Sequence, residues 1–191
     1  MENKANNKKK KKTSILEKLN IDKDSILDDY RLGYESRNAS LIGRREVLTG
    51  KAKFGIFGDG KEVAQLAMAK VFQNGDWRSG YYRDQTFMMA TDNLSLEQFF
   101  GQLYGDTSLE ANPDNSGRLM NNHFATRLLD ENGDWYDQTK QKNTSADISP
   151  TAGQMPRLLG LALASKVYRQ VEVLKEAKKF SVNGNEVAFG T

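Results

Sequence analysis

One stretch near the end of the chain limits the possible folds more than any other, SADISPTAGQMPRLLGLALASK at residues 145–166. The helix that we expect over residues 152–173 is apolar nearly all round and contains small residues that let another backbone approach closely. A helix of this kind is normally buried, at a domain or a subunit interface. Its leucines and small residues are Leu158, Leu159, Gly160, Leu161, Ala162, Leu163 and Ala164.

A charged turn follows this helix, and the chain then ends with NEVAFGT, in which residues 186–191 have the character of a β-strand. Helices and loops that lead into a buried-looking strand favour an α/β fold, with a parallel sheet flanked by helices. Only this strand is convincing. We therefore expect the sheet to be incomplete within residues 14–191, as in the N-terminal portion of a larger domain, with an unpaired edge that favours association.

The N-terminal part of this domain is expected to form an amphipathic helix. Its candidate N-caps are Asp24 and Ser25, and we expect residues 38–43 to interrupt it. The apolar residues that recur in it at helical spacing are Ile26, Leu27, Tyr30 and Tyr34.

Two shorter helices and a long loop are expected in the middle of the chain. The first helix covers residues 62–72, and the second follows Ser95, which is a candidate N-cap by its type and position. Residues 107–149 are polar and weakly periodic. A loop of that length inside a compact domain is usually functional or mobile.

The charge of the chain is unevenly distributed. The net charge is +3, but residues 1–12 contain six Lys and one Glu and contribute +5, which leaves −2 for residues 13–191. A segment this polar cannot bury enough apolar surface to offset the loss of conformational entropy on folding. We therefore expect residues 1–13 to form a disordered Lys-rich tail. The tail suits a solvated leader, or contact with RNA or an anionic lipid surface.

The composition excludes several classes of site. The absence of Cys excludes disulfides, thiolate metal sites and Cys nucleophiles, and the single His leaves a Ser-His-Asp hydrolase only one candidate base. There is no apolar run of the roughly 18 residues that a membrane span requires. Because the N-terminus has no apolar h-region and no A-x-A-like site, we expect a cytoplasmic protein.

Two loops carry groups suited to an anionic ligand. In SGYYRDQ, the phenols of Tyr81 and Tyr82 and the guanidinium of Arg83 are donors suited to diphosphate oxygens. The same residues would also suit an aromatic cluster under a surface ion pair. In FGIFGDG, the three glycines of residues 55–60 precede a helix, where main-chain amides can hold a phosphate. That stretch lacks the spacing and the Lys of known phosphate loops, so a flexible turn is the simpler interpretation.

His123 and the loop that precedes residue 152 complete the candidates. His123, in GRLMNNHF, is the one side chain that titrates near neutrality, and a lone loop His is either catalytic or structural. Pro150 disfavours a helical backbone at Ser149 and stiffens the loop. The Ser149 hydroxyl and the groups around Thr151 are therefore presented in fixed directions.

In this order and spacing, these stretches resemble the α part of the E1 component of thiamine-diphosphate-dependent 2-oxo acid dehydrogenases. They are more similar to the branched-chain type than to pyruvate dehydrogenase. The resemblance covers roughly the stretch from Tyr30 to Thr191. The segments that carry it are GDGKEVAQLAMA, YYRDQTFMMA, LYGD, GRLMNNH and ISPTAGQMPRLLGLALASK.

The resemblance implies a role for each candidate residue. The Tyr-Arg pair of the family binds the cofactor diphosphate, and the Ser-Pro loop lies against the cofactor. The family histidine lines the same cleft, which makes His123 a candidate catalytic residue without an assigned chemical role. The residues implied for cofactor binding are Tyr81, Tyr82, Arg83, Ser149 and Thr151.

The family pattern also differs from this sequence. In the family, the strand that matches NEVAFGT runs into a Gly-Asp-Gly/Ala stretch and an Asn that hold Mg²⁺ and the diphosphate, so the Mg²⁺ ligands are expected beyond Thr191. We therefore expect an N-terminal fragment that binds thiamine diphosphate weakly and has no turnover alone. Gln85 stands where the family often has His, and Gly153 stands where branched-chain enzymes carry a Thr beside a monovalent cation.

For the intact protein, the resemblance implies oxidative decarboxylation of a 2-oxo acid, branched-chain or pyruvate, with transfer of the acyl group to the lipoyl group of E2. The implied partners are an E1 β part, on the same or a separate chain, and the E2 lipoyl domain, in a homo- or hetero-oligomer without a membrane or nucleic acid. Two alternatives stay open: another thiamine-diphosphate enzyme, transketolase-like, and a non-catalytic interaction protein that uses its basic tail.

Overall fold

The fold is built on a short parallel sheet with the strand order β2-β1-β3. β1 is Trp77–Ser79, β2 is Asn143–Thr144 and β3 is Ala188–Gly190. Trp77 pairs with Asn143 on one side and with Ala188 on the other. This computed structural model describes residues 22–113, 115–176, 178–182 and 184–191, so the Lys-rich segment predicted at residues 1–13 lies outside the described residues.

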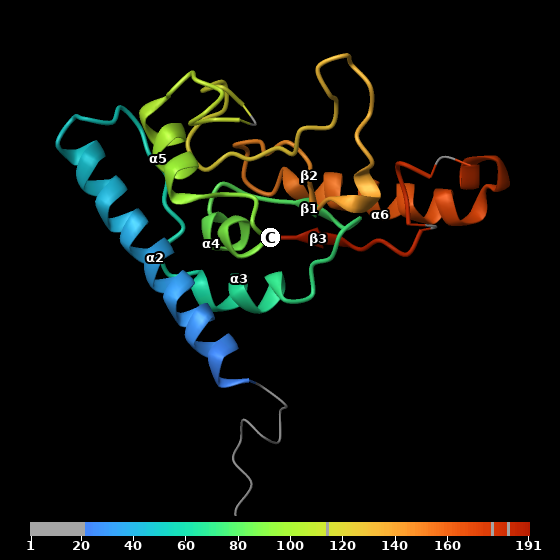
Figure 1. Cartoon of the computed structure of the whole chain (residues 1–191), viewed down its shortest axis with the longest axis horizontal. Coiled ribbons are helices and arrows are strands. Elements are labelled where there is room, and N and C mark those ends of the chain that lie inside the picture. The colour runs from blue at the N-terminus through green and yellow to red at the C-terminus, as the bar shows by residue number, and fades with distance from the viewer. Residues whose placement is uncertain (1–21, 114, 177, 183) are drawn as a thin grey trace, which may run out of the picture.

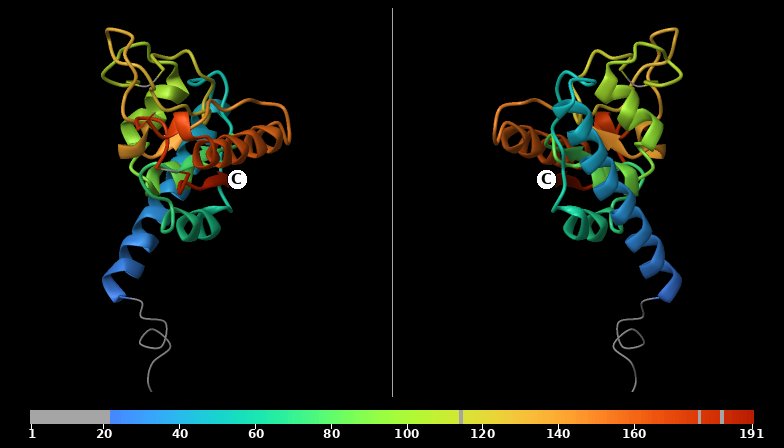
Figure 2. Two further views of the ribbon diagram at one scale, coloured as in Figure 1. Left: turned by 90° about the vertical axis from the view of Figure 1, so that its right-hand side faces the viewer. Right: turned by 90° about the vertical axis from the view of Figure 1, so that its left-hand side faces the viewer.

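Helices precede β1 and make up the crossovers between the strands (Figure 1). α6 runs along one side of the sheet, and the long α2 lies on the opposite side of the molecule, with its first half projecting from the body (Figures 1 and 2). The predicted α/β fold, a parallel sheet flanked by helices, is thus confirmed. The helical segments are α2 (Lys23–Leu48), α3 (Glu62–Ala69), α4 (Gln85–Ala90), α5 (Leu96–Tyr104), η1 (Gln138–Lys140), α6 (Gln154–Gln170) and η2 (Glu172–Glu176).

The two faces of β3 pack against different parts of the molecule. The ring of Phe189 lies 5.1 Å from that of Phe72, edge to face, on the side of the main core. Gly190 faces α6, where an added Cβ would come within 2.5 Å of Leu158. Successive side chains of a strand point to opposite faces, which explains the alternation. The core consists of Ala39, Ala69, Phe72, Phe87, Met88, Met89, Leu94, Phe99 and Phe124.

α2 differs from the helix predicted for its part of the sequence. Its N-cap is Asp22, whose carboxylate accepts the N–H of Ser25 at 3.1 Å, so the predicted caps were wrong. The helix also continues through residues 38–43, where an interruption was predicted. Tyr30 and Tyr34, of the predicted apolar stripe, are exposed. The buried residues of α2 are instead Ser36, Ala39, Ser40, Gly43 and Glu46.

Polar contacts with α4 explain why the second half of α2 is the buried half. The Gln85 side-chain amide donates to the Ser36 carbonyl at 2.7 Å and to the Ser40 hydroxyl at 3.2 Å. The hydroxyls of Ser36 and Thr86 lie 2.7 Å apart. Such satisfied polar groups are compatible with burial, and the small side chains let the helices approach closely. Gln85, one of the departures from the family pattern, is therefore directed into the α2–α4 interface.

The predicted helices α3, α5 and α6 are present, with differences at the ends of α3 and α6, whereas α4 was not predicted. Ser95 caps α5 as predicted, and the reciprocal bonds with Gln98 form a complete capping box. α3 ends at Ala69, three residues before the predicted end, and α6 is shorter than predicted at both ends. β1 and β2 were missed, because strands of two or three residues with polar side chains do not show the apolar run by which strands are recognised.

The described residues bury only one face of α6, whereas the sequence predicted that the helix would be buried on all sides. It packs against β1 and β3, but Leu159 and Leu163 stay 73% and 58% exposed. The exposed stripe, which we call the α6 stripe, consists of Met155, Leu159, Leu163 and Val167, at four-residue spacing. Among the described helices, none is long and apolar enough to cross a membrane.

Candidate functional site

The predicted site residues gather at the carboxyl end of the sheet. Tyr81 follows β1 by two residues, and Ser149 follows β2 by five. Because parallel strands present their following loops at one edge, this is the edge at which α/β proteins usually bind ligands. The arrangement brings together loops that are far apart in the sequence.

Five of the six candidate residues form one contact cluster. His123 Nε2 lies 2.9 Å from Ser149 Oγ, and its ring lies 5.9 Å from the ring of Tyr82 between centroids. The hydroxyl of Tyr82 is hydrogen-bonded to that of Tyr81. Tyr81 Oη in turn lies 3.1 Å from Thr151 Oγ1. These side-chain contacts join the loops after β1 and β2 to the His123 loop.

Arg83, the sixth candidate, lies at the side of this cluster and is exposed. Its guanidinium carbon lies 5.6 Å from the centroid of the Tyr82 ring. Together with Tyr81 and Lys61, Arg83 lines a cavity of about 440 Å³. Two cationic groups and a phenol in one cavity are suited to an anionic ligand such as a diphosphate. The other residues that line it are Ala64, Gln65, Met68, Asp84 and Thr191.

The two tyrosines differ in acidity although they are neighbours. The hydrogen bond with Thr151, and after it the one with Tyr82, lowers the pKa of Tyr81. The hydrogen bond with Tyr81 raises the pKa of Tyr82. The opposite directions follow from the hydrogen bond that the two phenols share and from the contact of Tyr81 with Thr151.

The orientation of His123 follows from its neighbours. Its Nδ1 lies 3.1 Å from the Asn121 carbonyl oxygen, which only accepts, so the neutral ring carries its proton on Nδ1 and Nε2 accepts from Ser149. Gln102 of α5 donates to the His123 carbonyl at 2.6 Å and accepts the N–H of Asn122 at 2.7 Å. Ser149 and the imidazole can exchange a proton, but a main-chain carbonyl stands where a hydrolase triad has a carboxylate.

A buried ion network, which we call the Arg78 network, holds the site loops together. Arg78 Nη2 donates to Asp84 at 2.5 Å and to Asp147 at 3.0 Å, and all three side chains are at most 5% exposed. Asp84 also accepts the N–H of Tyr81 at 2.8 Å, and Asp147 accepts the N–H of Phe124 at 3.0 Å. One guanidinium therefore connects the loops that carry the tyrosines, the histidine and the serine.

The sequence did not identify this network. Arg is rarely fully buried, and the two acidic partners lie 6 and 69 positions away from Arg78. Burial opposes the charge of Arg78, but the carboxylates of Asp84 and Asp147 outweigh it and raise the pKa of the guanidinium. Burial is also the largest influence on Asp147, and it raises the pKa of that carboxyl against the effect of Arg78. The one local feature that could have indicated the network is the position of Asp84, directly after the Tyr-Tyr-Arg sequence.

The glycine stretch at residues 55–60 supports the site as a closely packed turn. At Gly58, an added Cβ would lie 2.4 Å from the carbonyl oxygen of Arg83, so only Gly permits this approach. The Gly60 amide, a candidate phosphate donor, donates to the carboxylate of Glu62 at 3.0 Å. These contacts favour the turn interpretation over the phosphate loop.

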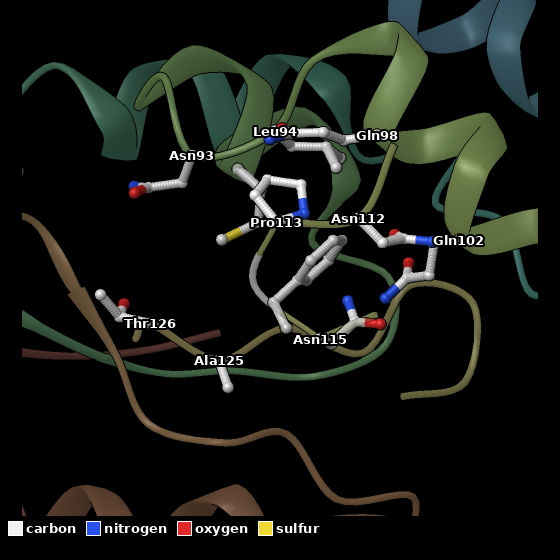
Figure 3. A pocket seen from close by; sticks show the side chains of 11 residues that line it. Asn93, Leu94, Gln98, Gln102, Asn112, Pro113, Asn115, Ala125 and Thr126 are labelled. Atoms are coloured by element: carbon white, nitrogen blue, oxygen red, sulfur yellow. The ribbon is translucent and has the colours of Figure 1, made fainter. Parts of the chain in front are cut away.

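A smaller cavity adjoins the His123 loop on the side of α5 and is lined by several side-chain amides (Figure 3). Its volume is about 50 Å³, which is room for one or two water molecules and far too little for a cofactor. Gln102 lines it and also holds the backbone at His123. The cavity therefore belongs to the support of the site. Among the described residues, no group of three or more His, Asp or Glu is arranged to hold a metal ion.

Comparison with curated proteins gave no match. A family model described as dehydrogenase E1 component matches residues 36–183, which is more than half of the chain and includes all six candidate residues and the Arg78 network. This match confirms the resemblance to the α part of the E1 component of thiamine-diphosphate-dependent 2-oxo acid dehydrogenases. The observed α/β architecture is consistent with the cofactor-binding fold of these enzymes. The chain belongs to the dehydrogenase E1 component family.

Proposed function

We propose that this chain holds the diphosphate of thiamine diphosphate in a 2-oxo acid dehydrogenase. The observation that supports this most directly is the cavity of about 440 Å³ in which Lys61, Tyr81 and Arg83 meet at the carboxyl end of the sheet. These groups supply the charge-assisted hydrogen bonds that a diphosphate needs. Arg83 is the main diphosphate-binding residue of the three, because its planar guanidinium can bind two oxygens at once.

The donor set fits the cofactor. When bound, thiamine diphosphate supplies the carbanion stabilisation for decarboxylation, with Mg²⁺ as the companion of its diphosphate. Tyr81, Tyr82 and Arg83 orient the diphosphate. Ser149 and Thr151 are both exposed and lie on the loop that follows β2, and from there they position the cofactor. His123 presents its Nε2 to the Ser149 hydroxyl at 2.9 Å, where it can accept a hydrogen bond or a proton.

We further propose that the substrate is a branched-chain 2-oxo acid or pyruvate, that the acyl group passes to a lipoyl group of E2, and that an E1 β part is the direct partner. The α6 stripe supports association, because its four large apolar side chains stand in water although burying them would be favourable by about 25 cal/mol per Å². A cytoplasmic location stays a prediction from the sequence.

Calorimetric titration of thiamine diphosphate with Mg²⁺ tests the proposal, with the full chain alone and with the chain mixed with an E1 β-type subunit. Arg83→Ala is expected to raise the apparent Kd at least tenfold, since a hydrogen bond to a charged group contributes roughly 1.5 to 3 kcal/mol. Arg45→Ala is the matched control, because Arg45 is an exposed arginine of α2 outside the site. A change below twofold for Arg83→Ala would remove Arg83 from the site, and no binding by either preparation would overturn the proposal.

The two alternative functions give different results in further assays. A transketolase-like enzyme would bind the cofactor but would not acylate a lipoyl domain. An interaction protein that uses its basic tail would bind RNA or an acidic partner with an affinity that falls steeply with salt. That binding would disappear when residues 1–12 are removed.

A further inference from the structure

We propose that a second cavity, outside the cofactor site, binds an organic cation of the alkylated ammonium class. The cavity has a volume of about 490 Å³ and shares no lining residue with the cavity at Arg83. Trp77, the first residue of β1, lines it, whereas the tyrosine loop follows the last residue of β1. The two cavities therefore lie toward opposite ends of the same strand, and the proposal does not depend on the cofactor assignment.

The walls of this cavity are largely aromatic. The rings of Trp135 and Phe180 lie 5.4 Å apart in an edge-to-face arrangement, and Leu128, Leu161 and Ala164 complete the apolar part of the wall. The faces of Trp and Tyr rings carry negative charge density and attract cations within about 6 Å of the ring centre. The aromatic residues of the wall are Trp77, Trp135, Tyr168 and Phe180.

Glu186 gives the cavity a fixed negative charge. It is the only charged side chain among the described residues that line the cavity. Its carboxylate accepts the Ser181 hydroxyl at 2.8 Å and the Val182 N–H at 2.9 Å, so its position is set before any ligand enters. A carboxylate beside several aromatic rings is complementary to a positively charged, partly apolar molecule.

The cationic side chains near this cavity do not neutralise Glu186. Lys179 donates to the main-chain carbonyl of Trp135 at 3.2 Å. Arg169 donates to the main-chain carbonyl of Gly184 at 3.1 Å. Neither side chain lines the cavity. Among the described side chains that line the cavity, the one charge is therefore negative.

Gln138 offers a polar contact inside the same cavity. The residue is 5% exposed, its main-chain N–H donates to Lys179 at 2.8 Å, and its side chain lines the cavity. A side-chain amide both donates and accepts hydrogen bonds. It therefore suits a ligand with a hydroxyl or carbonyl group near its ammonium centre.

Intrinsic fluorescence tests the proposal directly, because Trp77 and Trp135 are the two tryptophans of the chain and both line the cavity. The full chain is titrated with choline and, separately, with 3,3-dimethylbutan-1-ol, which has the same shape without the charge. We expect a saturable change with choline and at least tenfold weaker binding of the neutral alcohol. No saturable change with choline, or equal affinity for both probes, would overturn the proposal.

Three substitutions assign the binding to this cavity. Glu186→Gln is expected to weaken choline binding at least fivefold, whereas Glu172→Gln, at an exposed carboxylate on η2, leaves it unchanged. Trp135→Phe keeps an aromatic ring and is expected to retain most of the binding, which Trp135→Leu reduces at least fivefold. Trp135 is half-exposed, so neither of its variants removes a core contact, and circular dichroism checks the fold of each variant. Unchanged choline binding in both Glu186→Gln and Trp135→Leu would exclude this cavity.

Discussion

Two arginine–carboxylate clusters of this molecule have similar hydrogen bonds and different surroundings. In the Arg78 network, the guanidinium is fully buried between Asp84 and Asp147. On the surface, Arg37 of α2 binds Glu62 of α3 with two bonds of 2.6 and 2.9 Å, but the Arg37 side chain is 46% exposed. Bond length alone would predict that the two clusters stabilise the fold equally.

The difference in surroundings decides what each cluster does. A buried arginine without its partners keeps the full desolvation penalty of its charge, whereas an exposed one is solvated by water. The Arg78 network also joins loops 69 positions apart, while Arg37 and Glu62 join two helices that already pack together. The buried network thus fixes the geometry of the candidate site, whereas the surface pair contributes only a small stabilisation to the packing of α2 against α3.

The largest expected effect is that of Arg78→Met, which leaves two carboxylates buried without a counter-charge. We expect the free energy of unfolding to fall by about 3 to 5 kcal/mol, measured by urea denaturation. Arg37→Met is the matched surface control, with a much smaller expected loss because water solvates the exposed pair. Equal losses for the two variants would show that burial does not distinguish these clusters.

A smaller effect is expected for Asp147→Asn, which keeps the shape of the side chain and removes its charge. Arg78 retains Asp84, so we expect a loss of about 2 to 3 kcal/mol, in the range for a hydrogen bond between charged groups. The Phe124 N–H, which donates to Asp147, should exchange with solvent faster in this variant. Unchanged exchange at Phe124 would show that Asp147 does not hold the His123 loop.

The sequence predicted the architectural class and proposed the residues of the candidate site, but it did not indicate the network beneath them. Local patterns predicted α5 with its cap, the parallel α/β class and the six candidate residues, five of which cluster. These patterns are cap residues, helical spacing and motifs in one order. The Arg78 network depends on a tertiary contact over 69 positions, and neither Arg78 nor Asp147 differs locally from a surface residue. The buried half of α2 was missed for a related reason, because small polar residues are buried there by partners in α4.

A third prediction uses pH to sharpen the comparison. The hydrogen bond with Arg37 lowers the pKa of Glu62 to about 2. A carboxyl whose folded pKa is lowered adds stability above its unfolded pKa, near 4.5, and that stability is lost as the pH falls toward 2. We expect Glu62→Gln to lose about 1 kcal/mol at pH 7, less than the full shift implies, because Arg37 is screened by solvent.

Urea denaturation at several pH values between 7 and 3 measures this contribution. The difference in stability between the wild type and Glu62→Gln should shrink steadily below pH 4.5. A constant difference over this range would mean that the Glu62 charge is not responsible, and that the variant acts through packing or through the Gly60 amide.

The smallest effect is expected for the pair of Lys70 and Asp29, which lie 2.9 Å apart with both side chains partly exposed. Lys70→Gln should lower the free energy of unfolding by less than about 0.5 kcal/mol, because water solvates both groups and the flexible Lys chain loses entropy in the pair. If the pair acts only through its charges, 0.5 M NaCl should remove most of the difference between Lys70→Gln and the wild type. A loss above about 1.5 kcal/mol, or one that salt leaves unchanged, would contradict the comparison, since an exposed pair would then stabilise the fold as a buried one does.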